Sequence, residues 1–298
     1  VGAPVDALRQ DFDFHVDHEH YVDNAFATAY LGEASARIGR QQLPWGTGYA
    51  WNPTDIFHEK NFLDPTYEKR GVDAFKAVVP FSAMGSVTAV IGLKNLWSEA
   101  KKAVRFKDHV AGFDYSVSLM QEHVHEFDFL TSSSDDVERR FLAGDLSGSI
   151  GEFGVWFEGA YVNVPDRNDR VLALIGADHT TEAGWYLITE YYHNGFGASR
   201  RSDYSFNRWM RLIGETGDNL GRDYLFLGQS YPLTDLLTGS SYAILSLTDR
   251  SLVVYPYLEY SLSDNAVLTV IGYAPVGAAT SEFGAFGWGA IVRGRYYF

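Results

Sequence analysis

The amino-acid sequence predicts an all-β fold, a closed antiparallel barrel whose strands cross a membrane. Three observations carry this prediction. Polar and apolar residues alternate along many short segments, tight turns alternate with long connections between those segments, and the chain ends in an alternating aromatic stretch, WGAIVRGRYYF. A period of two places one face of a strand in an apolar medium and the other face in water.

The period of two is clearest in four segments, which read DFDFHVD over 11–17, VTAVIGLK over 87–94, FDYSVSL over 113–119 and PYLEYSLS over 256–263. Each segment has apolar side chains at every second position and mostly polar or small residues between them. A soluble β-sandwich produces the same pattern. The alternation therefore predicts strands but leaves open whether the apolar face meets lipid or a protein core.

The connections between the strands favour the membrane barrel. The short connections lie at 81–86, 149–154, 180–185, 232–239 and 261–266. The long connections lie at 45–70, 123–138, 162–169, 194–222 and 274–286. Outer-membrane barrels have tight turns on the periplasmic side and longer loops on the outside, so this distribution is typical of them.

About sixteen strands, within a range of roughly 14–18, fit between these connections. They are predicted over 8–17, 24–32, 35–44, 72–81, 86–95, 101–110, 113–122, 139–149, 154–163, 170–180, 185–193, 223–232, 239–247, 252–262, 266–274 and 287–298. An even number returns both ends of an antiparallel barrel to the same side. The segment 101–110 also fits a helix or part of a loop, but losing it would break this parity. No linker divides the chain, so we expect a single barrel domain over 1–298.

The composition limits the class of protein. The chain of 298 residues contains no run of 18 apolar residues, so no transmembrane helix is expected. It has no Cys, which excludes disulfides and thiolate metal sites. Asp and Glu (38) outnumber Lys and Arg (24), and the resulting net charge of −14 argues against nucleic acid as a partner. Aromatic residues make up 15% of the chain, which suits a sheet with an aromatic surface in lipid.

Several stretches resemble the porin-like outer-membrane β-barrels of Gram-negative bacteria, including the alginate-export type. In ARIGRQQLPWGTGYAWNPTDIF (36–57), a strand ending in Gly-Arg-Gln is followed by Trp-Gly and an Asn-Pro-x-Asp element in a long loop. SYPLTDLL (230–237), YSLSDNAVLTVIGY (260–273) and the terminal Tyr-Phe resemble the last strands of such barrels. The resemblance implies a location in the bacterial outer membrane and contact with its lipid and lipopolysaccharide. It also implies insertion by the barrel-assembly machinery, which reads the C-terminal aromatic residue.

If the apolar face meets lipid, the charged residues of the strands point inward, because a charge on the lipid side costs about 2–4 kcal/mol at the membrane midplane. The predicted lumen-lining residues are Asp11, Asp13, His15, Asp17, Arg37, Lys76, Lys94, Asp114, Glu158, Asp178, Glu190, Glu259, Arg293 and Arg295. An open lumen that selects solutes by charge fits this set. A plugged barrel with a salt-bridged interior fits it as well.

The long loop 45–70 has two interpretations. It either folds into the barrel as a constriction or stays outside, where its aromatic residues join the girdle at the membrane interface. The constriction candidates are Trp51, Asn52 and Asp55. The girdle candidates in the loop are Trp45, Tyr49 and Trp51, with Trp45 the preferred one. At the end of the chain, Tyr296 and Phe298 are assigned to the girdle and to recognition during assembly.

The histidines raise the question of a metal site. His18 and His20 share a strand face, and His123 and His125 lie beside acidic residues, but no fixed third ligand accompanies either pair. Polar residues of loops and of the barrel mouth are the preferred interpretation, and neither a metal nor another cofactor is expected. The motifs G-x-S-x-G and H-E-x-x-H and the phosphate loop are absent, so the chain is not expected to be an enzyme. A membrane-embedded hydrolase stays open as an alternative, because its catalytic triad would be scattered across strands.

These observations predict a porin-like passive channel for small hydrophilic solutes, in which charge and pore width set selectivity. The net charge of −14 predicts a weak preference for cations. The alternative is a structural or scaffold barrel that anchors or sheathes partner proteins in a membrane complex. A soluble β-rich binding protein is a third candidate. The loop 194–222 contains four arginines, Arg200, Arg201, Arg208 and Arg211. An exposed loop is the preferred interpretation, and a contact with acidic sugars or with a partner protein is the alternative, with the pair Arg200 and Arg201 as the local basic excess to test.

Overall fold

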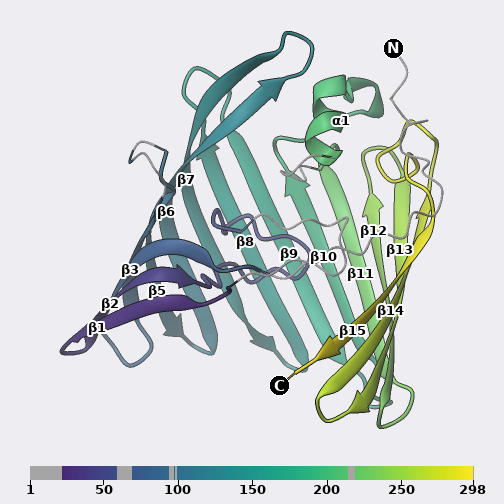
Figure 1. Cartoon of the computed structure of the whole chain (residues 1–298), viewed down its shortest axis with the longest axis horizontal. Helices are drawn as coiled ribbons and strands as arrows, with labels where there is room; N and C mark the ends of the chain where they lie inside the picture. Colours follow the sequence, from purple (N-terminus) through teal and green to yellow (C-terminus); the bar gives the residue numbers. More distant parts are fainter. Residues whose placement is uncertain (1–21, 59–68, 94–96, 98, 214–218, 298) are drawn as a thin grey trace.

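The described strands form one antiparallel sheet. The computed structural model describes residues 22–58, 69–93, 97, 99–213 and 219–297. Fifteen strands follow one another in sequence order, each hydrogen-bonded to the next, and the sheet curls around a central space (Figure 1). The strands are β1 (Ala25–Leu31), β2 (Ala34–Gln41), β3 (Val72–Pro80), β4 (Ser86–Gly92), β5 (Lys102–Val110), β6 (Phe113–Asp128), β7 (Ser133–Ile150), β8 (Phe153–Asn163), β9 (Arg170–Thr180), β10 (Tyr186–Asn194), β11 (Asp223–Pro232), β12 (Leu237–Ser246), β13 (Ser251–Ser263), β14 (Ala266–Val276) and β15 (Gly289–Tyr296). The helical elements between β10 and β11 are η2 (Arg201–Asp203) and α1 (Phe206–Ile213).

Each of these strands coincides with a predicted one, and their number lies within the predicted range. The remaining predicted strand, over 8–17, lies outside the described residues. The segment that also fitted a helix is the strand β5, which pairs with β4 and β6.

The prediction of a closed barrel is wrong for the described residues. β1 pairs with β2 and β15 pairs with β14, but no pairing within the described chain joins β1 to β15. The two edges stand apart in Figure 1. Closure requires hydrogen bonding between the first and last strands and a matching tilt and stagger of all the others. These are properties of the whole sheet, so alternation within each strand could not establish them.

The hairpin of β6 and β7 is longer than the sequence predicted. A loop was expected over 123–138, but β6 continues to Asp128 and β7 begins at Ser133, and the hairpin rises above its neighbours (Figure 1). Opposite charges meet across the two strands, as in the register partners Arg139 and Glu122, whose side chains approach to 3.7 Å. Such cross-strand pairs stabilise a sheet where apolar residues are few, which explains why a polar segment forms strands here.

The two faces of the sheet are opposite in character to those of a soluble protein. On β6, Val117 and Leu119 are 49% and 63% exposed, whereas Ser116 and Ser118 between and beside them are 3% and 2% exposed. This confirms the predicted register, in which the apolar set faces outward. An exposed apolar face opposite a buried polar face suits strands that have hydrocarbon outside and polar groups inside. The chain is therefore built as an outer-membrane protein.

The two ends of the sheet differ in the length of their connections. Short turns occupy one end, at 32–33, 81–85, 111–112, 151–152, 181–185, 233–236 and 264–265. The longest loops occupy the other end, at 42–71, 195–222 and 277–288. This confirms the predicted alternation, which assigns the short-turn end to the periplasm. None of the described helices is long and apolar enough to cross a membrane.

Candidate functional site

The loop that follows β2 lies inside the curled sheet. Residues 42–58 occupy the central space in Figure 1, and Trp51 and Phe57 are buried. Trp51 packs in a cluster with inward-facing side chains of β9 to β14, and Phe57 packs in a second cluster with those of β3 to β9. Of the two interpretations of this loop, the inward fold is the one observed. Residues 59–68 of the loop lie outside the described residues.

A buried carboxylate on β8 holds the first part of this loop. Glu158 is fully buried, and its Oε1 atom accepts hydrogen bonds from the backbone N–H groups of Thr47 and Gly48, the latter at 2.6 Å. Its Oε2 atom accepts from the backbone N–H of Thr54 at 3.1 Å and from the Thr54 hydroxyl at 2.7 Å. Because an ionised carboxylate is costly to bury without such donors, these bonds make the position of the loop and the charge of Glu158 depend on each other.

A second buried carboxylate, Glu190 on β10, holds the next residues. It accepts from the backbone N–H groups of Tyr49 and Ala50, the latter at 2.6 Å. The indole Nε1–H of Trp156 on β8 donates to the same carboxylate at 2.8 Å. Seven backbone and side-chain donors of the loop, five to Glu158 and two to Glu190, are thus directed at carboxylates on the sheet wall. The loop is fixed by charge-assisted hydrogen bonds as well as by apolar packing.

Two glycines allow the loop to approach the wall so closely. Gly46 has a φ of 81°, in the region that side chains of L-residues rarely adopt, and a Cβ there would lie 2.8 Å from the side chain of Asn52. A Cβ on Gly48 would lie 2.0 Å from the carbonyl oxygen of Trp51. The Gly-Thr-Gly sequence therefore permits the compact turn that presents the N–H groups to Glu158.

The assignment of Trp45 to the membrane girdle is wrong. Trp45 is 6% exposed, its ring meets Phe57 edge-on at 5.3 Å, and the guanidinium of Arg105 lies 5.4 Å from its ring centre. The inward turn of the loop carries Trp45 into the interior, where it packs with inward-facing residues. Aromatic side chains near the short-turn end fit the girdle better, such as the stacked Phe81 and Phe106 with ring centres 5.0 Å apart.

The other girdle assignments fall on the last residues of the chain. Tyr296 is 66% exposed on the outer side of β15, as a girdle residue would be. Phe298 lies outside the described residues.

The three constriction candidates all lie in the inward loop. Trp51 donates its Nε1–H to Asn219 at 3.0 Å and stacks on Tyr192 with ring centres 5.0 Å apart. Asn52 donates to the carbonyl of Trp45 at 3.4 Å. Their position inside the sheet agrees with the prediction, whereas their action on a passing solute stays a prediction.

Asp55, the third candidate, organises the end of the loop. Its Oδ1 atom accepts from the backbone N–H groups of Phe57 and His58 at 3.0 and 3.2 Å, and its Oδ2 atom lies 2.8 Å from the Lys69 ammonium. Burial alone would raise the pKa of Asp55, but the hydrogen bond with His58 and the charge of Lys69 outweigh burial, and the pKa is lowered. Asp55 therefore stays ionised in a buried position.

The charged residues predicted to line the lumen lie on the inner face wherever they are described. Those on the inner face are Arg37, Lys76, Asp114, Glu158, Asp178, Glu190, Glu259, Arg293 and Arg295. Those outside the described residues are Asp11, Asp13, His15, Asp17 and Lys94. The structure gives Glu158 and Glu190 a further role that the sequence did not indicate, because both hold the loop instead of facing open water. Contact of the other residues with solute stays a prediction.

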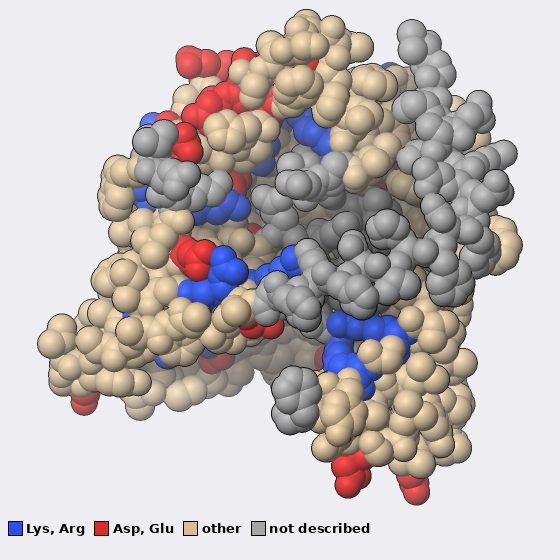
Figure 2. Space-filling view, in the orientation of Figure 1, with Lys and Arg blue, Asp and Glu red and all other residues tan. Residues whose placement is uncertain are grey.

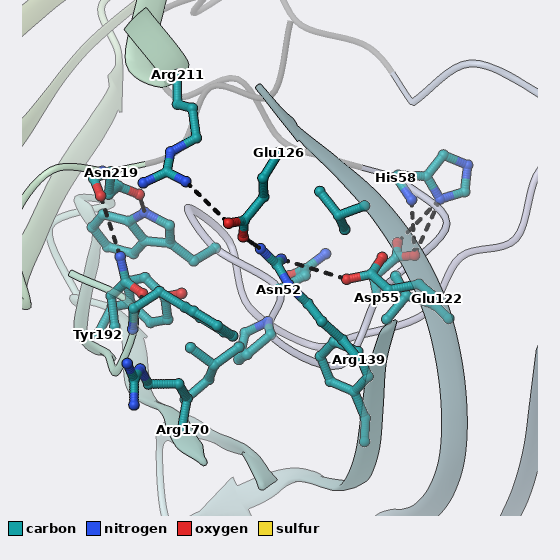
Figure 3. A pocket seen from close by; sticks show the side chains of 18 of the residues that line it. Asn52, Asp55, His58, Glu122, Glu126, Arg139, Arg170, Tyr192, Arg211 and Asn219 are labelled. Atoms are coloured by element: carbon teal, nitrogen blue, oxygen red, sulfur yellow. Dashed lines mark hydrogen bonds and ion pairs between the residues drawn. The ribbon is translucent and has the colours of Figure 1, made fainter. Parts of the chain in front are cut away.

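A cavity of about 340 Å³ lies between the inward loop and the outer parts of β6 to β10. Its charged and titratable lining residues are Asp55, His58, Glu122, Glu126, Arg139, Arg167, Arg170, Arg208 and Arg211. Figure 3 shows Arg139 and Arg211 directed at Glu126 from opposite sides. Of this set, the sequence identified Asp55 as a constriction candidate and Arg208 and Arg211 as basic residues of the loop 194–222, and it did not identify the others. The period of two in 113–119 fades where polar residues take the outward positions at Gln121, His123 and His125, so no signal in the sequence marked Glu122 and Glu126.

A buried carboxylate also joins the loops at the outer end. Glu282, in the loop 277–288, accepts from the Tyr224 hydroxyl at 2.5 Å and from the backbone N–H of Leu220 at 3.0 Å. Its own backbone N–H donates to the carboxylate of Asp249 at 2.7 Å. Burial raises the pKa of Glu282 to about 7, and the charge of Asp249 acts in the same direction, whereas the bonds from Tyr224 and Leu220 oppose this increase.

Most histidines of the described chain lie beside a carboxylate, whereas His179 contacts the backbone carbonyl of Glu152. His123 and His125 lie 3.3 and 3.6 Å from the carboxylate of Asp136 on the outer part of the hairpin. Within the described residues, no group of three His, Asp or Glu side chains is arranged to hold a metal ion. His18 and His20 lie outside these residues. Arg200 and Arg201 are exposed, at and next to the short helix η2.

No family model matches the chain, and no curated protein matches it. Among solved structures, it is similar to OmpT, an outer membrane protein of Vibrio cholerae, in the form folded in vitro, with 13% identity and a TM-score of 0.44 over 93% of this chain and 80% of that one. It is also similar to the OmpT variant that lacks loop L8, with 13% identity and a TM-score of 0.43 over the same shares. The outer-membrane expressed OmpT matches with 12% identity and a TM-score of 0.43, over 93% and 81% of the two chains. The predicted location, the bacterial outer membrane, is that of these proteins, but similarity at this level does not establish a shared activity.

The expectation that the chain is not an enzyme needs correction. It rested on the absence of short linear motifs, whereas the structures that match are OmpT outer-membrane proteins and the sheet of this chain is built from many separate strands. Catalytic side chains on such a sheet would come from different strands and form no linear motif. The missing motifs therefore do not exclude an enzyme, and that exclusion is withdrawn.

Proposed function

We propose that the chain is a passive channel for small hydrophilic solutes across the outer membrane, with the loop 42–58 as its constriction. The observation that carries this proposal is the position of the loop, inside the curled sheet and bound to Glu158 and Glu190 of the wall. A loop held in this way narrows a central path at a defined depth. Channels select solutes by pore width and by the charges that line the path.

The way in which the loop is held supports a functional role for it. Burying a charge is expensive, and replacing buried charged groups with apolar ones is often neutral or stabilising. A loop needed only to fill space could be packed by apolar side chains alone. Glu158 and Glu190 instead fix the backbone of residues 47–54 through directed hydrogen bonds, which gives the narrow point a fixed geometry.

Conductance in planar lipid bilayers tests the proposal. The refolded protein is expected to produce discrete conductance steps in potassium chloride. A variant in which residues 46–54 are replaced by a short Gly-Ser linker is expected to give larger steps, because the constriction is removed. Absence of steps from correctly folded protein would reject the channel, and unchanged step size in the variant would reject the loop as its constriction.

One observation favours the alternative, a structural or scaffold barrel. The aromatic residues of the loop stack on wall residues, with Tyr49 and Phe226 ring centres 5.3 Å apart and Trp51 and Tyr192 ring centres 5.0 Å apart. Such packing fills part of the interior and would suit a plugged sheet that anchors or sheathes a partner protein. In the bilayer experiment, folded protein without conductance would favour this second function.

A further inference from the structure

The cavity above the inward loop contains an unusual convergence of arginines. Three guanidinium groups approach the single carboxylate of Glu126, from β7, from the loop 164–169 and from α1. Arg167 lies 2.7 Å from Oε2 of Glu126, Arg139 lies 3.2 Å from Oε1, and Arg211 lies 3.6 Å from Oε2. Figure 3 shows Arg139, Arg211 and Glu126 meeting in the cavity. Guanidinium groups are well suited to carboxylates because their N–H donors match the two carboxylate oxygens.

The charge of the cavity lining is opposite in sign to that of the whole chain. Among the described residues, five arginines and three carboxylates line the cavity, which leaves an excess of two positive charges in this part of the lining, whereas the chain carries −14. Two of the three carboxylates also have a lysine beside them, Lys69 at 2.8 Å from Asp55 and Lys101 at 3.6 Å from Glu122. Figure 2 shows Lys and Arg side chains around the central hollow of the molecule. The net charge of the chain is therefore a poor guide to the charge at this site.

The uncharged part of the lining suits an organic ligand. Trp51 and Tyr192 form a stacked aromatic wall, and Asn52, Asn194 and Asn219 provide amide groups on the same cavity. A pocket with an apolar wall and a few polar groups orients a carbon skeleton, while the charged groups select its ends. The volume of about 340 Å³ is at the small end of the usual range for ligand sites.

We propose that this cavity binds small organic anions that carry carboxylate groups, at the outer entrance of the channel. The carboxylate of Glu126 shows the geometry in which the arginines hold such a group, and it offsets part of their charge in the absence of ligand. The proposal rests on the proposed function for its place on a solute path, but binding itself can be measured without transport. A ligand carboxylate takes a place among Arg139, Arg167 and Arg211, with its carbon chain against Trp51.

Binding of succinate to the full-length protein in detergent, measured by isothermal titration calorimetry, tests the proposal, with uncharged succinamide as the reference ligand. Succinate is expected to bind and succinamide is not. The double variant Arg167→Gln with Arg211→Gln is expected to weaken succinate binding by more than roughly tenfold, because two charge-assisted contacts are lost. Glu126→Gln is expected to strengthen binding, because it removes the competing negative charge and preserves the shape of the side chain.

Arg250→Gln is the matched control. It removes one positive charge from an exposed turn that does not line the cavity, and it is expected to leave succinate binding unchanged. Failure of the parent protein to bind succinate would overturn the proposal. Weaker binding in Glu126→Gln would also overturn it, and because this substitution is conservative, the test does not depend on how well the arginine double variant folds.

Bilayer recordings separate this inference from the proposed function. Parent protein that conducts and prefers chloride over potassium, with a preference reduced in the arginine double variant, would support both. Conductance without succinate binding would support the channel proposal and reject the proposed anion site. Succinate binding without any conductance would support the proposed anion site and reject the channel proposal.

Discussion

Replacing Glu158 with Gln is expected to release the inward loop. In the parent, Oε1 accepts from three donors of the loop, the N–H groups of Thr47 and Gly48 and the Thr47 hydroxyl, and Oε2 accepts from the N–H and hydroxyl of Thr54. Glutamine keeps one oxygen and places an NH₂ group at the other position. Whichever way the amide is oriented, at least two donors lose their carboxylate acceptor, and at least one backbone N–H then faces the NH₂ group.

The size of the effect follows from these contacts. A hydrogen bond to a charged group contributes about 1.5–3 kcal/mol, so the loss of two costs roughly 3–6 kcal/mol. Each 1.4 kcal/mol changes an equilibrium about tenfold, so the docked form of the loop is expected to decrease by at least roughly a hundredfold relative to the undocked form. The apolar contacts of Trp51 and Phe57 oppose this release but do not replace the lost bonds.

Two measurements check the prediction. Chymotrypsin is expected to cut the detergent-folded variant at Trp51 or Phe57, which are buried in the parent, and the conductance steps in bilayers are expected to become larger. Glu152→Gln is the control, because it makes the same chemical change at an exposed residue of the short turn 151–152. If Glu158→Gln resisted chymotrypsin as well as Glu152→Gln does, the reasoning about the loop anchors would be refuted.

Three further predictions concern the loop, the outer loops and the outer face. Gly48→Ala is expected to expose the inward loop to chymotrypsin, because the added Cβ would lie 2.0 Å from a backbone oxygen, whereas Gly289→Ala, which meets no atom within 4 Å, is expected to resemble the parent. Because the pKa of Glu282 is raised from 4.5 to about 7 in the folded protein, the folded state holds a proton that the unfolded state releases within this window. Thermal stability is therefore expected to fall as pH rises from about 4.5 to about 7, and a melting series in which Glu282→Gln keeps the same slope would contradict this origin. Leu119→Arg is expected to reduce the amount of folded protein in membranes by placing a charge on the lipid face at a cost of about 2–4 kcal/mol, and equal amounts of this variant and of Leu130→Arg, in the exposed turn 129–132, would argue against the assigned face.

The sequence by itself determined the strands, their faces and the two kinds of connection. These features are local, because the period of two fixes which side chains share a face and the turn residues fix where a strand ends. In β6, the alternation of Tyr115, Val117 and Leu119 with Ser116 and Ser118 was sufficient to assign the outward and inward sets. The same alternation underestimated the length of the hairpin of β6 and β7. The outer part of this hairpin has few apolar residues at the outward positions, and its strands are stabilised by charged pairs across the hairpin.

Only the tertiary structure decided where the long loops go and which charges meet. Trp45 is of the residue type that forms membrane girdles, yet it lies inside the sheet. The reason is that Glu158 and Glu190, more than a hundred residues later in the chain, bind the backbone of the loop just after it. Glu126, Arg139, Arg167 and Arg211 come from two strands, a loop and a helix, and no spacing in the sequence relates them. Electrostatic energy depends on distances in space, so a chain with a net charge of −14 can still form a cavity with a positive lining.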